Sequence, residues 1–111
     1  MAFKIYGKVI EEETEKGIPN LKVRAIDRDL IFDDILGSVT TDEDGNFEIK
    51  YDKEDFQELF LDRSPDYYLE VKNKDGEVIY TTKTKVVYDA TESEEFVVRI
   101  PKSLIKGKGE D

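Results

Sequence analysis

The chain has 111 residues, of which 27 are acidic and 17 are basic, and it contains neither cysteine nor histidine. This length fits one domain with a core large enough to fold without disulfide bonds or a structural metal ion. The lack of cysteine excludes a disulfide framework and a thiolate metal site. The net charge of −10 repels phosphate backbones, so we expect cations or basic surfaces as partners and no nucleic acid.

Alternation of apolar and polar residues predicts four strands in the first half of the chain. Their expected ranges are 3–10, 21–27, 36–41 and 47–51. The segment "EEETEKGIPN" between the first two strands has Gly17 and Pro19 as turn signals, and its glutamates predict a solvated loop. In "DEDGN", Asp44 and Gly45 predict a tight hairpin turn between the third and fourth strands.

The period of the apolar pattern changes after the fourth strand. Apolar residues spaced three and four apart predict a short helix near residues 53–61. Alternation then returns, and a second Asp-Gly pair predicts another turn. The expected later strands are 67–71, 78–80, 86–88 and 96–100.

Many short strands separated by turn signals are typical of an all-β sandwich. We expect residues 1–103 to form this domain and 104–111 to be a flexible polar tail. The residues expected to share its interior are Val23, Phe47, Val71 and Val98.

Two stretches, "GKVIEEETEKGIPNLKVRAID" and "GSVTTDEDGNFEI", resemble the transthyretin-like domains, also called carboxypeptidase-regulatory-like domains. The resemblance continues more loosely through "YYLEVKNKDGEVIYTT" and "EEFVVRIP". It implies an Ig-like, prealbumin-like antiparallel β-sandwich of about seven strands. The commonest use of this family is a non-catalytic module for adhesion, spacing or partner contact, and we expect the same here.

The catalytic relatives within the resemblance depend on residues that this chain lacks. Hydroxyisourate hydrolases rely on histidines and a tail motif, and intradiol dioxygenases hold iron with tyrosines and histidines. Without histidine or cysteine, Ser-His-Asp and Cys-His constellations cannot form either. We therefore expect no enzyme, with a carboxylate-based hydrolase or an enzyme accessory domain as the alternative.

Four aspartates fall within a short acidic segment and predict a divalent cation site, with calcium as the expected ion. They are Asp27, Asp29, Asp33 and Asp34. The competing interpretation is ordinary turn chemistry, in which the carboxylates cap backbone N–H groups or pair with Arg24 and Arg28. Asp42 and Asp44 belong to the hairpin turn, which we expect at the opposite end of the sandwich.

The same acidic segment, "DRDLIFDDILG", also resembles the calcium loop of C2 domains. A C2-like calcium-binding fold is therefore the alternative fold. C2 domains take a further aspartate pair from a separate loop, and no such pair can be placed in this sequence.

Five tyrosines could form an aromatic face for contact with a protein or a sugar. They are Tyr6, Tyr67, Tyr68, Tyr80 and Tyr88. If Leu69 and Val71 are core, alternation places Tyr67 inside and Tyr68 outside.

The sequence gives only general indications of the cellular location, thermal stability and partners of the protein. No apolar run is long enough for a membrane helix, and we expect either a cytoplasmic protein or a domain excised from a secreted one. The 40% of charged residues favours a thermostable protein. A protein partner or self-association through sandwich edges is expected, without a marked interface.

Overall fold

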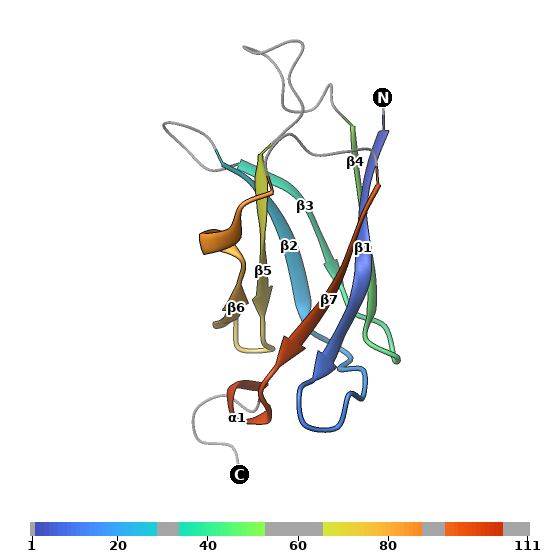
Figure 1. Cartoon of the computed structure of the whole chain (residues 1–111), viewed down its shortest axis with the longest axis vertical. Coiled ribbons are helices and arrows are strands. Elements are labelled where there is room, and N and C mark those ends of the chain that lie inside the picture. Colours follow the sequence, from blue (N-terminus) through green and yellow to red (C-terminus); the bar gives the residue numbers. More distant parts are fainter. Residues whose placement is uncertain (1, 29–33, 53–65, 88–92, 106–111) are drawn as a thin grey trace.

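The computed structural model describes residues 2–28, 34–52, 66–87 and 93–105, which form two facing β-sheets (Figure 1). One sheet has three strands in the order β4-β1-β7, and the other has four in the order β3-β2-β5-β6. These seven strands confirm the prediction of an all-β sandwich. The predicted helix near residues 53–61 lies outside the described residues.

The three-stranded sheet is built around β1 (Ala2–Glu11). Its antiparallel neighbour is β4 (Asn46–Asp52), and its other neighbour, β7 (Ser93–Ile100), runs parallel to it. The predicted antiparallel sandwich therefore includes one parallel pair. Gly7 permits the pairing, because a Cβ atom there would collide with the carbonyl oxygen of Phe96.

The four-stranded sheet has β2 (Lys22–Asp27) and β5 (Tyr67–Lys72) at its centre. Its edge strands are β3 (Asp34–Thr40) and β6 (Val78–Thr81). A register shift between β2 and β3 follows Ala25, so the extra residue bends β3 against its neighbour.

The strand predicted at residues 86–88 is not formed as such. A 3-10 turn, η2 (Lys83–Lys85), precedes this segment, and Val87 makes one isolated bridge to Tyr67. The bridge consists of two backbone hydrogen bonds of 2.9 and 2.8 Å. Tyr88 lies outside the described residues.

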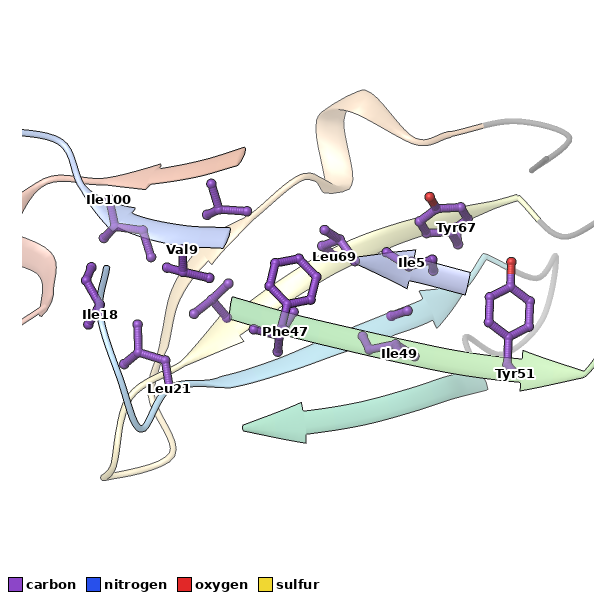
Figure 2. Packing of buried hydrophobic residues seen from close by; sticks show 14 of the residues in the cluster. Ile5, Val9, Ile18, Leu21, Phe47, Ile49, Tyr51, Tyr67, Leu69 and Ile100 are labelled. Carbon is purple, nitrogen blue, oxygen red and sulfur yellow. The ribbon is translucent and has the colours of Figure 1, made fainter. Parts of the chain in front are cut away.

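The inward side chains of both sheets form one hydrophobic core (Figure 2). The predicted interior residues Val23, Phe47, Val71 and Val98 all belong to it. Each alternates along its strand with residues that face away, so the two-residue period of the sequence is the direct cause of this packing. Figure 2 shows Ile18 and Leu21 at one end of the cluster and Tyr51 and Tyr67 at the other.

Hydrogen bonds close the end of the sandwich that holds the hairpin turn of residues 42–46, and we call it the turn end. Gly45 has a φ of +82°, which confirms the predicted tight turn. The buried hydroxyl of Thr41 donates to the carbonyl oxygen of Ile18 over 2.7 Å and accepts from the N–H of Leu21 over 3.0 Å. This hydroxyl therefore joins the loop before β2 to the end of β3.

The glutamate-rich segment after β1 is exposed, as predicted, but it is also tied to the chain around β7. Arg99 donates to Glu15 over 2.9 Å, and the backbone N–H of Lys102 donates to Glu13 over 3.0 Å. Lys102 begins a single helical turn, α1 (Lys102–Ile105). Residues 106–111 lie outside the described part, so the flexible tail stays a prediction. None of the described helices has the length and apolar character to span a bilayer.

Candidate functional site

The end of the sandwich opposite the turn end carries polar residues on its inward faces. Asp27, the last residue of β2, is the register partner of Asp34 in β3 and of Tyr67 in β5. Directly opposed residues on neighbouring antiparallel strands have Cβ atoms about 5 Å apart. Asp27 follows Val23 and Ala25 at two-residue spacing, so it lies on the face that holds the core.

The opposing sheet contributes a second inward carboxylate. Glu94 in β7 precedes Phe96 and Val98 at two-residue spacing, and its register partner in β1 is the fully buried Ile5. Its side chain is therefore on the core side of the sheet, and it is half-buried. An inward acid at the edge of a sandwich core is costly unless something stabilises its charge.

Two buried tyrosines lie near these carboxylates. The exposed fraction is 0% for Tyr67 and 5% for Tyr51. Tyr51 stacks on Phe3 with ring centroids 5.1 Å apart, and Tyr67 meets Phe96 edge to face at 6.2 Å. We call the inward-facing group of Asp27, Tyr51, Tyr67 and Glu94 the tyrosine end.

Electrostatics link the four residues of the tyrosine end. Burial raises the pKa of Tyr51 far above its ordinary value of 10.0, and the charges of Asp27 and Glu94 raise it further. Burial also raises the pKa of Tyr67, followed in size by the charge of Glu94 and the neighbouring Tyr51. Both phenols are therefore neutral at physiological pH.

The hydroxyl of Tyr67 is buried and has no hydrogen-bond partner within the part of the chain that the structure describes. A buried hydroxyl without a partner costs about 1–3 kcal/mol of stability. Buried polar groups without partners are rare in folded proteins, so this hydroxyl needs a physical explanation.

The structure describes two of the four aspartates that were predicted to hold calcium. Asp27 and Asp34 are backbone register partners at the start of the segment, whereas Asp29 and Asp33 lie outside the described residues. Among the residues that the structure describes, no three acidic side chains are grouped so that they could hold a metal ion. Calcium binding by these aspartates stays a prediction.

The acids of the turn end have a structural role. Asp42 accepts hydrogen bonds from the backbone N–H groups of Asp44 and Asn46, each over 2.9 Å. The bond from Asn46 is the main reason that the pKa of Asp42 is lowered from 3.8. The β2–β3 register pairs Lys22 with Thr40 at this end and Asp27 with Asp34 at the other, so the predicted separation of the two acidic segments is confirmed.

The predicted aromatic face is not formed by the tyrosines that the structure describes. Tyr6 lies on the outside of the three-stranded sheet, whereas Tyr67 and Tyr80 pack in or against the core. Tyr67 is inside, as predicted. Tyr68 has outward parity, but only 5% of it is exposed, so the prediction of an exposed Tyr68 is wrong. Alternation indicates the face of a sheet on which a residue lies, and it does not indicate what covers that face.

The outer faces of both sheets carry basic residues whose charges are largely matched within the sheets. Glu48 lies within 4.0 Å of Lys4 and 3.5 Å of Lys50. Arg24 and Lys72 lie 3.4 and 4.0 Å from Glu70. The competing interpretation of the acidic segment paired its carboxylates with Arg24 and Arg28. The guanidinium of Arg24 instead forms an ion pair with Glu70. The exposed pairs of Glu48 contribute about 0–1 kcal/mol each.

A hollow at the turn end lies between residues 18–21, the turn at 73–75 and Ile105. Its volume is about 180 Å³, below the roughly 300–1,000 Å³ of typical ligand pockets. Asp75 is the one carboxylate that lines it, so this hollow does not supply the carboxylate pair of the hydrolase alternative.

Sequence reasoning missed Glu94 and Tyr51 as site residues. The signal was present, because Glu94 has the same parity as Phe96, Val98 and Ile100 in "SEEFVVRI". An acidic residue at an inward position of a predicted strand is a conflict, because the alternation of the strand assigns that position to an apolar side chain. Such conflicts are expected at functional sites.

Residues 14–90 match the family model TTR-52, transthyretin-like family. No curated protein sequence matches the chain. The matched segment covers β2 to β6 and includes Asp27, Tyr51 and Tyr67. It favours the transthyretin-like prediction over the C2-like alternative.

Two solved structures are similar in fold. A 9R-lipoxygenase from Cyanothece PCC8801 is 25% identical, with a TM-score of 0.61 over 90% of this chain and 16% of that chain. A DUF3823 family protein from Bacteroides uniformis is 14% identical, with a TM-score of 0.54 over 91% of this chain and 43% of that chain. The chain thus spans less than half of either protein, and the second likeness concerns the fold alone.

Proposed function

Because this chain belongs to the transthyretin-like family, we propose that it is a non-catalytic β-sandwich module that binds a protein partner through the tyrosine end. The partner is another protein or a second copy of this chain. The observation that carries the proposal is the meeting of two inward carboxylates, Asp27 and Glu94, with the buried hydroxyl of Tyr67. The turn end and the outer faces of the sheets show ordinary structural uses for their charges.

A non-catalytic role is supported by the side chains that the sequence lacks. There is no histidine or cysteine to act as a base or nucleophile near neutral pH. The hydroxyls of Tyr51 and Tyr67 are poor nucleophiles as well, because their pKa values are raised and they keep their protons. The net charge of −10 favours a basic partner surface over an acidic one.

The test compares variants at the two ends of the sandwich for retention of a partner. Asp27→Asn with Glu94→Gln alters the tyrosine end, and Asp44→Asn with Glu43→Gln removes the same number of charges at the turn end. A partner cross-linked to the wild type is expected to be lost from the first variant and kept by the second. Equal retention by both variants would show that the tyrosine end is not the binding end.

We also propose that a calcium ion stabilises the acidic segment through Asp27, Asp29, Asp33 and Asp34. Support comes from the β2–β3 register, which places the backbones of Asp27 and Asp34 directly opposite each other. Carboxylate oxygens are ligands that calcium accepts, and the ion would offset the repulsion among the carboxylates that it binds. The ion would hold the segment at one position on the sandwich.

Thermal melting with and without millimolar calcium tests this second proposal. Binding to the folded state alone raises stability by about 2.7 kcal/mol at a hundredfold excess over the dissociation constant. Asp29→Asn with Asp33→Asn is expected to abolish the rise, whereas Asp44→Asn at the turn end keeps it. If millimolar calcium does not change the melting temperature of the wild type, the proposal is contradicted.

A further inference from the structure

The tyrosine end combines three hydrogen-bonding groups that come from different strands and from both sheets. Asp27 and Tyr67 are neighbours on β2 and β5, and Glu94 faces them from β7. The charge of Glu94 raises the pKa of both tyrosines and that of Asp27 raises the pKa of Tyr51, so each carboxylate lies within electrostatic reach of a buried phenol. Asp27 and Glu94 are only half-buried, which opens the group to solvent.

The hydroxyl of Tyr67 is the observation that separates this group from an ordinary acidic cluster. It is fully buried and has no hydrogen-bond partner in the described part of the chain. Its oxygen can accept a hydrogen bond from a ligand, and its O–H can donate one. The walls beside it are aromatic, with Phe96 edge-on to Tyr67 at 6.2 Å between ring centroids.

We propose that the tyrosine end is a receptor for a primary alkylammonium group, held by the carboxylates of Asp27 and Glu94 and by the hydroxyl oxygen of Tyr67. This inference rests on the proposed function, in which the tyrosine end is the binding end. The group is carried by the side chain of a lysine on the partner protein or by a free amine.

An ammonium group fits these residues better than a metal ion does. Its three N–H donors match the three acceptors, and the aromatic walls accept its alkyl chain and attract its charge. A calcium ion needs six to eight oxygen ligands from carboxylates, carbonyl groups and water, whereas the phenols here remain neutral.

The test is an NMR titration of the full, isotope-labelled chain at constant ionic strength. The probes are n-butylammonium chloride and a short capped peptide with one lysine, each matched by sodium chloride and by the same peptide with norleucine. We expect saturable shifts of the Tyr67 and Glu94 amides at roughly millimolar ammonium, the scale set by a few charge-assisted hydrogen bonds. Response to the peptide alone identifies a partner lysine, and response to both probes identifies a general ammonium site.

Matched variants separate the site from general attraction to an acidic protein. Glu94→Gln is expected to weaken binding at least about tenfold, because a hydrogen bond to a charged group is lost. Glu95→Gln removes the same charge from the next residue, which is exposed on the outer face, and is expected to change little. Equal weakening by both variants overturns the proposal.

Tyr67→Phe supplies an independent readout without ligand. If the hydroxyl waits for a ligand, its removal leaves the unliganded protein as stable or more stable and weakens ammonium binding. Tyr80→Phe, at a half-buried tyrosine of β6, is the control. A clear loss of stability in unliganded Tyr67→Phe shows that the chain already satisfies this hydroxyl, which also overturns the proposal.

The experiments distinguish failure of the ammonium proposal from failure of the proposal that the tyrosine end binds a protein partner. If the ammonium probes do not bind but Asp27→Asn with Glu94→Gln still loses the partner, the tyrosine end remains the binding end and its ligand is of another class. If the probes bind to the wild type but the variant Asp27→Asn with Glu94→Gln still retains the partner, the ammonium site is real and the partner binds elsewhere.

Discussion

The two ends of the sandwich use their carboxylates differently. At the turn end, Asp42 accepts two backbone hydrogen bonds within its own turn, and Glu15 pairs with Arg99. At the tyrosine end, Asp27 and Glu94 lie on inward faces beside buried phenols. A carboxylate that caps a turn serves the local backbone, whereas an inward carboxylate lowers stability unless another group offsets its desolvation.

The contrast shows why the count of acids in a segment is a poor guide to function. The segment "TDEDGN" is as acidic as many metal loops, yet its geometry is that of a capped hairpin turn. The group at the tyrosine end comes from residues that are far apart in the sequence. Its significance comes from the direction of its side chains and from the buried hydroxyl of Tyr67.

The largest expected effect tests how tightly the turn end is closed. Gly45→Ala places a Cβ atom against the carbonyl oxygen of Val9, which accepts from the N–H of Ile18 over 2.9 Å. With the added strain of a positive φ, we expect a loss of about 3 kcal/mol in urea unfolding.

Gly76→Ala is the matched control for this prediction. Gly76 has the same φ of +82°, but an added Cβ atom there meets nothing within 4 Å. It should cost only about 1 kcal/mol, from backbone strain alone. Equal losses for the two variants would contradict the tight closure of the turn end.

The second prediction concerns alkaline stability at the tyrosine end. Because burial raises the folded-state pKa of Tyr51 and Tyr67 above 10.0, the unfolded chain loses these protons first as pH rises. The contribution of these two protonated phenols to the free energy of unfolding is therefore fully present below pH 10 and is lost as pH rises above it. Tyr51→Phe with Tyr67→Phe should flatten the fall of the melting temperature above pH 10. An unaltered slope in the double variant would mean that these phenols ionise freely in the folded protein.

The smallest effect is expected at Asp42. Its pKa is lowered in the folded state, chiefly by the N–H of Asn46, so its contribution is present above the ordinary pKa of 3.8 and is lost as pH falls through the lowered value. Asp42→Asn keeps the cap, as Asn73 does for the turn at residues 73–77, but removes the titration. The stability difference between wild type and variant should therefore narrow in acid. Asp75→Asn, which alters a residue that does not cap its turn, is the control.

Much of the sandwich was predictable because its signals are local. Alternation placed Val23, Phe47, Val71 and Val98 in one interior, and the Asp-Gly pairs marked both hairpin turns. The parallel pairing of β1 and β7 was not predictable in the same way. It joins the first and last strands of the chain, and no turn connects them to reveal their relative direction.

The candidate site was predictable only in part. Asp27 was identified from an acidic run, but Tyr67 was expected simply as core and Glu94 was not singled out. The burial of Tyr68 was also missed, because cover from other segments does not follow from parity.

The sequence by itself determined which residues alternate, where the chain turns, and that neither histidine nor cysteine chemistry is present. These properties depend on neighbours one to four positions away. Only the tertiary structure decided that Asp27 and Glu94 face one interior and that the hydroxyl of Tyr67 is buried there. The reason is physical, because the meeting of side chains from β2, β5 and β7 depends on the register and stacking of two sheets.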